Sequence, residues 1–213
     1  MDQLRASDKN KITGLILAGG RGSRMGNLDK GLQQLDGMAL VERVIQRIKP
    51  QVSDLAINAN RHLKEYARFG LPVWTDPEAN AESPDESEFR GPLAGVETGL
   101  RHCKTPYMLV VPCDSPFLPA DLALRLFSAL QLADIAVACT GNAESPRLQP
   151  VFCLIKISML QQLQAYLDSG GRRMDGWYSD ANVAKVHFSD EAAFSNINTF
   201  EELRSYSFAK PAK

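Results

Sequence analysis

Residues 12–30 read ITGLILAGGRGSRMGNLDK. The stretch begins with an apolar run, Ile12–Leu17, of the kind found in parallel strands that are buried on both faces. A glycine-rich loop follows, and glycine allows backbone N–H groups to approach an anion closely. Arg21, Arg24 and Lys30 then supply positive charge. This order predicts a β-strand that ends in a phosphate-binding loop.

The composition is that of one soluble α/β domain. The chain has 213 residues, of which 44% are hydrophobic and 23% are charged, enough to bury a sizeable core. A net charge of −1 argues against binding nucleic acid or a membrane surface. The four cysteines are widely spaced, and the sequence has neither a signal peptide nor an apolar run of bilayer length. We therefore expect reduced thiols and a cytoplasmic monomer.

The apolar runs and turn signals alternate along the chain. Strands are expected at 12–17, 55–58, 73–75, 107–111, 135–139, 151–155 and 183–188. Helices are expected at 40–48, at 63–69, after 91–95, from Pro119, from Ser158 as N-cap, and from Thr199, where Thr199 and Glu202 form a capping box. This alternation predicts a doubly wound, mostly parallel sheet with right-handed crossovers, in a three-layer α/β/α domain.

The predicted domain covers residues 12–207. Residues 1–11 are polar and are expected to form a disordered extension, and 208–213 a frayed tail. The acidic, aperiodic segment 78–90 is expected to be a loop or lid.

Polar residues follow several of the expected strands. Ligands of such sheets bind beyond the carboxyl ends of the strands, so Asn58, Asp76 and Asp114 should lie at one edge with the first loop. Asp114 ends an apolar strand, and a carboxylate there is a suitable ligand for Mg²⁺. Turn formation is an alternative role for Asn58, Asn60, Asp76 and Asp114.

Two common nucleotide-binding motifs are excluded. The first loop lacks the Gly-Lys-Ser/Thr of a P-loop. Met25 stands where the third glycine of a dinucleotide fingerprint belongs, and the second strand ends in Asn58 rather than an acidic residue.

The chain instead resembles the molybdenum cofactor guanylyltransferases (the MobA family), which belong to the nucleotidyltransferases with a Rossmann-like fold. The resemblance runs from about Ile12 to Leu203 and depends on an ordered set of short motifs. These are Leu17–Gly20, Arg24–Gly26, Asp29–Gly31, Asn58–Arg61, Asp76, Gly91–Gly95, Pro112–Pro116, Gly171–Arg173 and Asn196–Thr199.

The resemblance implies a role for each matching residue. Leu17, Ala18, Gly19 and Gly20 would hold the guanine nucleotide, with Gly19-Gly20 favouring guanine. Arg24 and Lys30 would bind the triphosphate, and Asn58 and Asp76 would contact the nucleotide. Asp114 would bind nucleotide and Mg²⁺, whereas Arg172, Asn196 and Asn198 are associated with the pterin or the closed site. Asn196 and Asn198 could instead only order the chain ahead of Thr199.

The resemblance also implies a reaction: transfer of GMP from GTP to molybdenum-molybdopterin, with the N-terminal half binding GTP and the C-terminal half binding the pterin. Molybdopterin-delivering proteins and apo-molybdoenzymes would be its partners. Two alternatives stay open. One is a cytidylyltransferase or sugar-phosphate nucleotidyltransferase on the same fold, and the other is a non-catalytic carrier of GTP and molybdopterin.

Two positions depart from the family pattern. Asn27 stands where many members have a second glycine, and asparagine tolerates the left-handed conformation better than most residues. Gln149 precedes Pro150 where members often carry histidine, which puts a pterin contact there in doubt.

Overall fold

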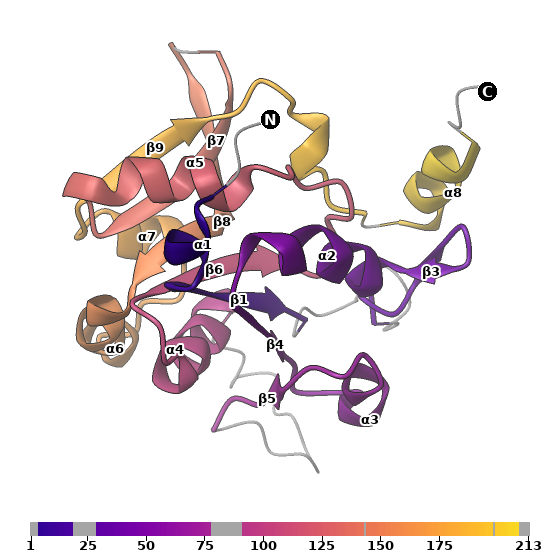
Figure 1. The fold of residues 1–213 in the computed structure, drawn as a ribbon, viewed down its shortest axis with the longest axis horizontal. Coiled ribbons are helices and arrows are strands. Elements are labelled where there is room, and N and C mark those ends of the chain that lie inside the picture. Colours follow the sequence, from indigo (N-terminus) through magenta and orange to yellow (C-terminus); the bar gives the residue numbers. More distant parts are fainter. Residues whose placement is uncertain (1–3, 19–28, 78–90, 143, 198, 209–213) are drawn as a thin grey trace.

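A central β-sheet organises the protein. The computed structural model describes residues 4–18, 29–77, 91–142, 144–197 and 199–208. The strands of the sheet are β1 (Ile12–Leu17), β4 (Asp54–Asn58), β5 (Val73–Trp74), β6 (Tyr107–Pro112), β7 (Ile135–Gly141), β8 (Pro146–Lys156) and β9 (Val183–His187). They form one seven-stranded sheet in the order β5-β4-β1-β6-β8-β7-β9 (Figure 1).

The sheet is mostly parallel, as predicted. β1 pairs in parallel with β4 on one side and with β6 on the other. β8 is the exception, because it runs antiparallel to both β6 and β7. The chain leaves β1 in one direction to build β4 and β5, and it returns to place β6 on the opposite side of β1. The sheet therefore has a topological switch point between β1 and β6.

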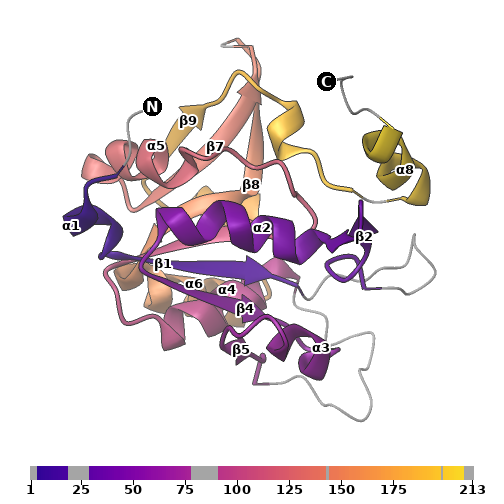
Figure 2. The same ribbon diagram turned by 45° about the vertical axis from the view of Figure 1, so that its right-hand side comes forward.

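Helices cover both faces of the sheet. Their bounds are α1 (Ala6–Lys9), α2 (Leu40–Ile48), α3 (Leu63–Ala67), α4 (Pro92–His102), α5 (Leu122–Ala129), α6 (Leu160–Asp168), α7 (Met174–Tyr178) and α8 (Phe200–Phe208). The apolar side chains of α2 and α5 share one core cluster, and those of α4, α6 and α7 share another. Figure 2 shows α2 on one side of β1, and α4 and α6 on the other. The predicted three-layer α/β/α architecture is thus confirmed.

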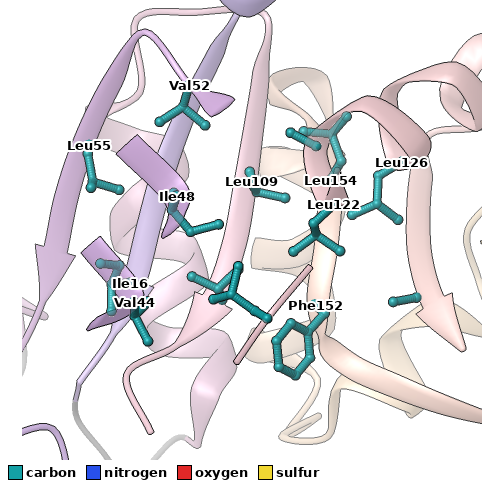
Figure 3. Packing of buried hydrophobic residues seen from close by; sticks show 14 of the residues in the cluster. Ile16, Val44, Ile48, Val52, Leu55, Leu109, Leu122, Leu126, Phe152 and Leu154 are labelled. Carbon is teal, nitrogen blue, oxygen red and sulfur yellow. The ribbon is translucent and has the colours of Figure 1, made fainter. Parts of the chain in front are cut away.

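Alternating side chains of β6 feed the two cores. Leu109 belongs to the cluster of α2 and α5, whereas Met108 and Val110 belong to the cluster of α4 and α6. Successive residues of a strand point to opposite faces, so a strand that is buried on both faces must be apolar throughout. Figure 3 shows Leu109 between Ile48 of α2 and Leu122 of α5.

A third, smaller cluster connects the C-terminal helix to a hairpin. The hairpin consists of β2 (Gln34–Leu35) and β3 (Met38–Ala39). Its turn residues Asp36 and Gly37 have φ of 51° and 79°, the pattern of a turn that suits twisted strands. Leu35, Leu40 and Ile197 are buried together, with Leu203 and Tyr206 of α8 packed against them.

Several expectations need correction. The predicted disorder of residues 1–11 fails at Ala6–Lys9, which form α1. Ser158 does not cap α6, because it lies within a 3-10 turn, Ile157–Met159, that leads into the helix. The short helix α7 was not expected. Strands β7 and β8 extend beyond the expected bounds into a long hairpin. The four cysteines are free, as expected, although Cys103 is only half-buried.

The capping box is confirmed. The Thr199 hydroxyl accepts from the Glu202 amide at 3.1 Å, and the Glu202 carboxylate accepts from the Thr199 amide at 3.2 Å. Within the described ranges, no helix has the length and apolar character that crossing a membrane requires.

The position of Leu109 makes a testable prediction. We expect Leu109→Ala to lower the free energy of unfolding by about 2–5 kcal/mol, because the side chain is fully buried between α2 and α5. The matched control is Leu132→Ala, since Leu132 is 91% exposed, and we expect a change within about 0.5 kcal/mol. Urea denaturation measures both values. Equal effects of the two substitutions would contradict the described core.

Candidate functional site

The site lies where the carboxyl ends of β4, β1 and β6 come level. Leu17 is paired with Asn58 of β4 and with Pro112 of β6. One residue further on, the Ala18 amide donates to the Asn58 carbonyl at 2.8 Å. Leu17 and Ala18 thus lie at the carboxyl end of β1, as the sequence predicts.

Lys30 and Asp114 form an ion pair across this edge. Lys30 Nζ lies 3.4 Å from Asp114 Oδ2, and the two side chains are 20% and 10% exposed. Lys30 comes from the connection after β1, and Asp114 follows β6 by two residues. The prediction that both lie at one edge of the sheet is confirmed.

The environment of Asp114 sets its protonation. Burial raises the pKa of the Asp114 carboxyl, and the neighbouring Lys30 ammonium opposes that shift. Asp114 is thus a partly desolvated carboxylate that faces the Lys30 ammonium, and a cation at this carboxylate stabilises its charged form.

The donor set suits a metal ion that is shared with a substrate. Within the described ranges, no group of three or more His, Cys, Asp or Glu side chains gathers in a way that could hold a metal ion. Mg²⁺ is commonly held by one or two carboxylates together with phosphate oxygens and water. Asp114 therefore fits Mg²⁺ bound jointly with a nucleotide.

Asp76 is the centre of a hydrogen-bond network. Its Oδ1 accepts from Asn58 Nδ2 at 2.8 Å and from Thr98 Oγ1 at 2.6 Å. Its Oδ2 accepts from Asn60 Nδ2 at 2.8 Å, and its amide donates to Asn60 Oδ1 at 2.9 Å. The network joins β4, β5 and α4, so Asp76 is more than a turn residue.

Asn58 is buried inside that network. Its Nδ2 also donates to the Trp74 carbonyl at 3.1 Å, so both amide hydrogens have partners. A Cβ atom at Gly95 would lie 2.3 Å from Asn58 Oδ1, which shows how closely α4 approaches. Asn58 is therefore bonded to Trp74 of β5 and to Asp76, and its side chain lies directly against α4 at Gly95.

The C-terminal segment reaches the Asp114 loop. The Ile197 amide donates to the Asp114 carbonyl at 2.9 Å. Ser115 Oγ donates to Asn196 Oδ1 at 2.5 Å. Asn196 is exposed and lies next to the loop that carries Asp114.

Arg172 has a different setting. Its Nη1 donates to the carbonyls of Leu167 at 2.8 Å and Gly171 at 2.7 Å, so the guanidinium caps the end of α6. Its carbonyl would lie 3.1 Å from a Cβ atom at Gly91. The backbone of Arg172 therefore lies close to Gly91, the residue that precedes α4, whereas its side chain points to the end of α6.

Some predicted residues cannot be placed. Gly19, Gly20, Arg24 and Asn198 lie outside the described residues, as do Asn27 and the acidic segment 78–90. Gln149 is described within β8, where its Nε2 donates to Thr140 Oγ1 at 3.0 Å.

Sequence reasoning assigned no role to four polar residues of this edge, Asp29, Tyr66, Thr98 and Ser115, although Asp29 and Ser115 lie within the quoted motifs. Asp29 directly precedes Lys30, which was the available signal. Thr98 and Tyr66 lie in helices and carry no local pattern that separates them from packing residues.

The close approach at Gly95 predicts a specific sensitivity. Gly95→Ala forces the new methyl group into Asn58, which its hydrogen bonds hold in place, at an overpacking cost of about 1–3 kcal/mol. The matched control is Gly99→Ala in the same helix, where the methyl group would meet the flexible Leu15 and Met108 side chains. Both changes gain about 1 kcal/mol of helix propensity. We expect urea denaturation to show Gly95→Ala as the less stable variant, and the reverse order would contradict the rigid network.

The raised pKa of Asp114 predicts a pH-dependent stability. The folded state binds this proton more tightly than the unfolded state, so the wild type loses stability as pH rises from 3.8 through the raised pKa. Asp114→Asn has no proton to lose and can still accept from Lys30. We expect its stability relative to wild type to increase across that window and to be no lower than wild type at neutral pH.

Urea denaturation at a series of pH values measures this difference. The matched control is the exposed Asp180→Asn, which should follow the wild-type curve. An Asp114→Asn protein that is less stable than wild type at neutral pH would show that the Lys30 pair outweighs the cost of burial.

Comparison with known proteins identifies the family. Residues 14–182 match the family model of the MobA-like NTP transferase domain. The chain is 51% identical over 201 residues to the molybdenum cofactor guanylyltransferase of Cupriavidus necator, covering 93% of this chain and 97% of the relative. It is 50% identical over 199 residues to the enzyme of that name from Bordetella pertussis, with coverage of 92% and 97%.

Solved structures share the fold. Molybdopterin-guanine dinucleotide biosynthesis protein A from Archaeoglobus fulgidus superposes with a TM-score of 0.71 at 21% identity, covering 92% of this chain and 96% of that one. A 4-diphosphocytidyl-2C-methyl-D-erythritol synthase from Anaerococcus prevotii gives a TM-score of 0.71 at 13% identity, with coverage of 94% and 96%. The family model and the half-identical relatives decide the assignment: the chain belongs to the MobA-like NTP transferases and is a nucleotidyltransferase.

Proposed function

We propose that the protein transfers GMP from GTP to molybdenum-molybdopterin, which yields molybdopterin guanine dinucleotide and pyrophosphate. The observation that carries the proposal is the Lys30–Asp114 pair at the switch point of the sheet, at 3.4 Å. A cation and a carboxylate placed together there suit a nucleoside triphosphate with its metal ion. The shared name of the relatives from Cupriavidus and Bordetella supports guanine as the base and molybdenum cofactor as the acceptor.

The proposed chemistry needs no covalent intermediate. The terminal phosphate oxygen of molybdopterin attacks the α-phosphorus of GTP and forms a new P–O bond. The bond between the α-phosphorus and the bridging oxygen breaks, and pyrophosphate leaves with the electron pair. Catalysis then consists of positioning and of neutralising charge on the phosphates.

Lys30 supplies the positive charge for that task. Its ammonium stands at the edge where the triphosphate would lie and stabilises the departing pyrophosphate. Arg24, from the same loop in sequence, is proposed to assist it. Asp114 would hold Mg²⁺, which supplies further neutralisation of phosphate oxygens when it is bound.

The two substrates are proposed to bind to different parts of the chain. Leu17, Ala18 and the Gly19-Gly20 pair would contact the guanine nucleotide, and the Asn58–Asp76 network would hold the neighbouring ends of β4 and β5 in place. Asn196 would face the pterin, which is supported by its hydrogen bond to Ser115, the residue after Asp114. Arg172 and Asn198 are proposed to act from the same side.

The test is product formation by the purified protein. With GTP, Mg²⁺ and molybdopterin we expect molybdopterin guanine dinucleotide, detected by chromatography, and a weaker response to CTP in a parallel binding measurement. Tighter binding of CTP than of GTP would favour a cytidylyltransferase. The absence of dinucleotide, while a known enzyme forms it under the same conditions, would overturn the proposal.

Asp114→Ala separates a transferase from a carrier. We expect the substitution to lower turnover by about 100-fold or more. Without its carboxylate ligand the metal ion would no longer be held where it neutralises charge on the phosphates. A non-catalytic carrier would keep docking and delivery to apo-molybdoenzymes in the same variant. The control is Leu132→Ala, whose turnover should equal that of wild type.

A further inference from the structure

A buried hydroxyl beside the site has no role in the proposed reaction. Tyr66 belongs to α3 and is fully buried, and its hydroxyl donates to Asp29 Oδ1 at 2.5 Å. Burial, followed by the neighbouring Cys113 and Asp29, raises the pKa of Tyr66. The hydroxyl therefore keeps its proton and acts as a donor at every working pH.

The acceptor of this hydrogen bond holds the chain on both sides of Lys30. The same Asp29 Oδ1 accepts from the Gly31 amide at 3.0 Å. The Asp29 carbonyl accepts from Gln33 Nε2 at 2.9 Å. These two bonds close a turn around Lys30, and the Tyr66 hydroxyl fixes the carboxylate on which the turn depends.

The same turn is held between two buried side chains. A Cβ atom at Gly31 would lie 2.6 Å from the Tyr66 hydroxyl oxygen and 3.1 Å from Cys113 Sγ. Cys113 directly precedes Asp114, so the turn that carries Lys30 rests against the backbone that carries its partner. The Gly31 carbonyl also accepts from the Val41 amide at 2.9 Å, which ties the turn to α2.

We propose that Tyr66 is a positioning residue that, through Asp29 and Gly31, holds the Lys30 ammonium opposite Asp114. The inference rests on the proposed function, because Tyr66 affects the reaction only through Lys30, whose charge is proposed to neutralise the phosphates. Tyr66 itself touches no substrate. Its ring packs in the core near Phe69, with centroids 6.5 Å apart, and this packing role is the competing explanation.

Tyr66→Phe separates the two roles, because it removes the hydroxyl and keeps the ring. We expect kcat for dinucleotide formation to fall about tenfold, with the KM for molybdopterin unchanged, since an imprecisely placed charge raises the barrier to transfer. The matched control is Tyr178→Phe. Tyr178 is also buried and donates to the Pro150 carbonyl at 2.6 Å, outside this turn, so we expect kcat within about twofold of wild type.

A double-mutant cycle identifies the route. If Tyr66 acts through Lys30, Tyr66→Phe should cause no further loss of kcat in a Lys30→Ala background. The same tenfold loss in both backgrounds, or equal losses in Tyr66→Phe and Tyr178→Phe, would overturn the proposal.

Hydrogen exchange tests the positioning without any substrate. We expect the Gly31 amide to exchange faster in Tyr66→Phe than in wild type or Tyr178→Phe, because its acceptor is no longer fixed. Unchanged exchange at Gly31 would overturn the role of Tyr66. Failure of the wild type to form dinucleotide would overturn the proposed function instead. The exchange measurement needs no substrate, so it would still test whether Tyr66 holds the turn at Gly31.

Discussion

The parallel pairing of β1 with β4 and β6 is the constraint on which the site depends. Backbone hydrogen bonds hold Leu17 opposite Asn58 and Pro112, so the three strands end at one level. Asn58 ends β4 and Asp114 follows β6 by two residues, so this alignment places both side chains at one edge. The strands are largely apolar on both faces because helices cover both, and the polar side chains of the site lie at the carboxyl ends of the strands or beyond them. The hydrophobic core and the candidate site thus occupy different positions along the strand axis.

Local signals in the sequence predicted much of this arrangement. The bounds of β1 agree with the structure, and the Thr199–Glu202 capping box forms as its residue types require. Lys30 and Asp114 could be brought together in advance, because the carboxyl ends of parallel strands share an edge. These features depend on short-range chemistry or on topology, and both can be predicted from a single sequence.

Other features depend on contacts that no local pattern carries. The antiparallel direction of β8 results from its pairing with β6 and β7, which periodicity does not encode. The helix α7 has five residues with Gly176 among them, and Trp177 and Tyr178 stabilise it by burial. Tyr66 has the sequence surroundings of an ordinary core tyrosine, and only the fold brings its hydroxyl to Asp29. The Ser158 cap failed because a 3-10 turn precedes α6.

The C-terminal segment has a consequence for how the protein opens. Ile197 is joined to the Asp114 carbonyl, and α8 packs through the small cluster of Leu35, Leu40 and Ile197, whereas the sheet is supported by two large cores. Units with few buried contacts open at lower free energy than the global transition. The enzyme should therefore have a locally unfolded state in which the sheet persists while the wall beside Asp114 has separated. Such a state would open the edge of the sheet at which Asn196 and Ile197 contact Ser115 and Asp114.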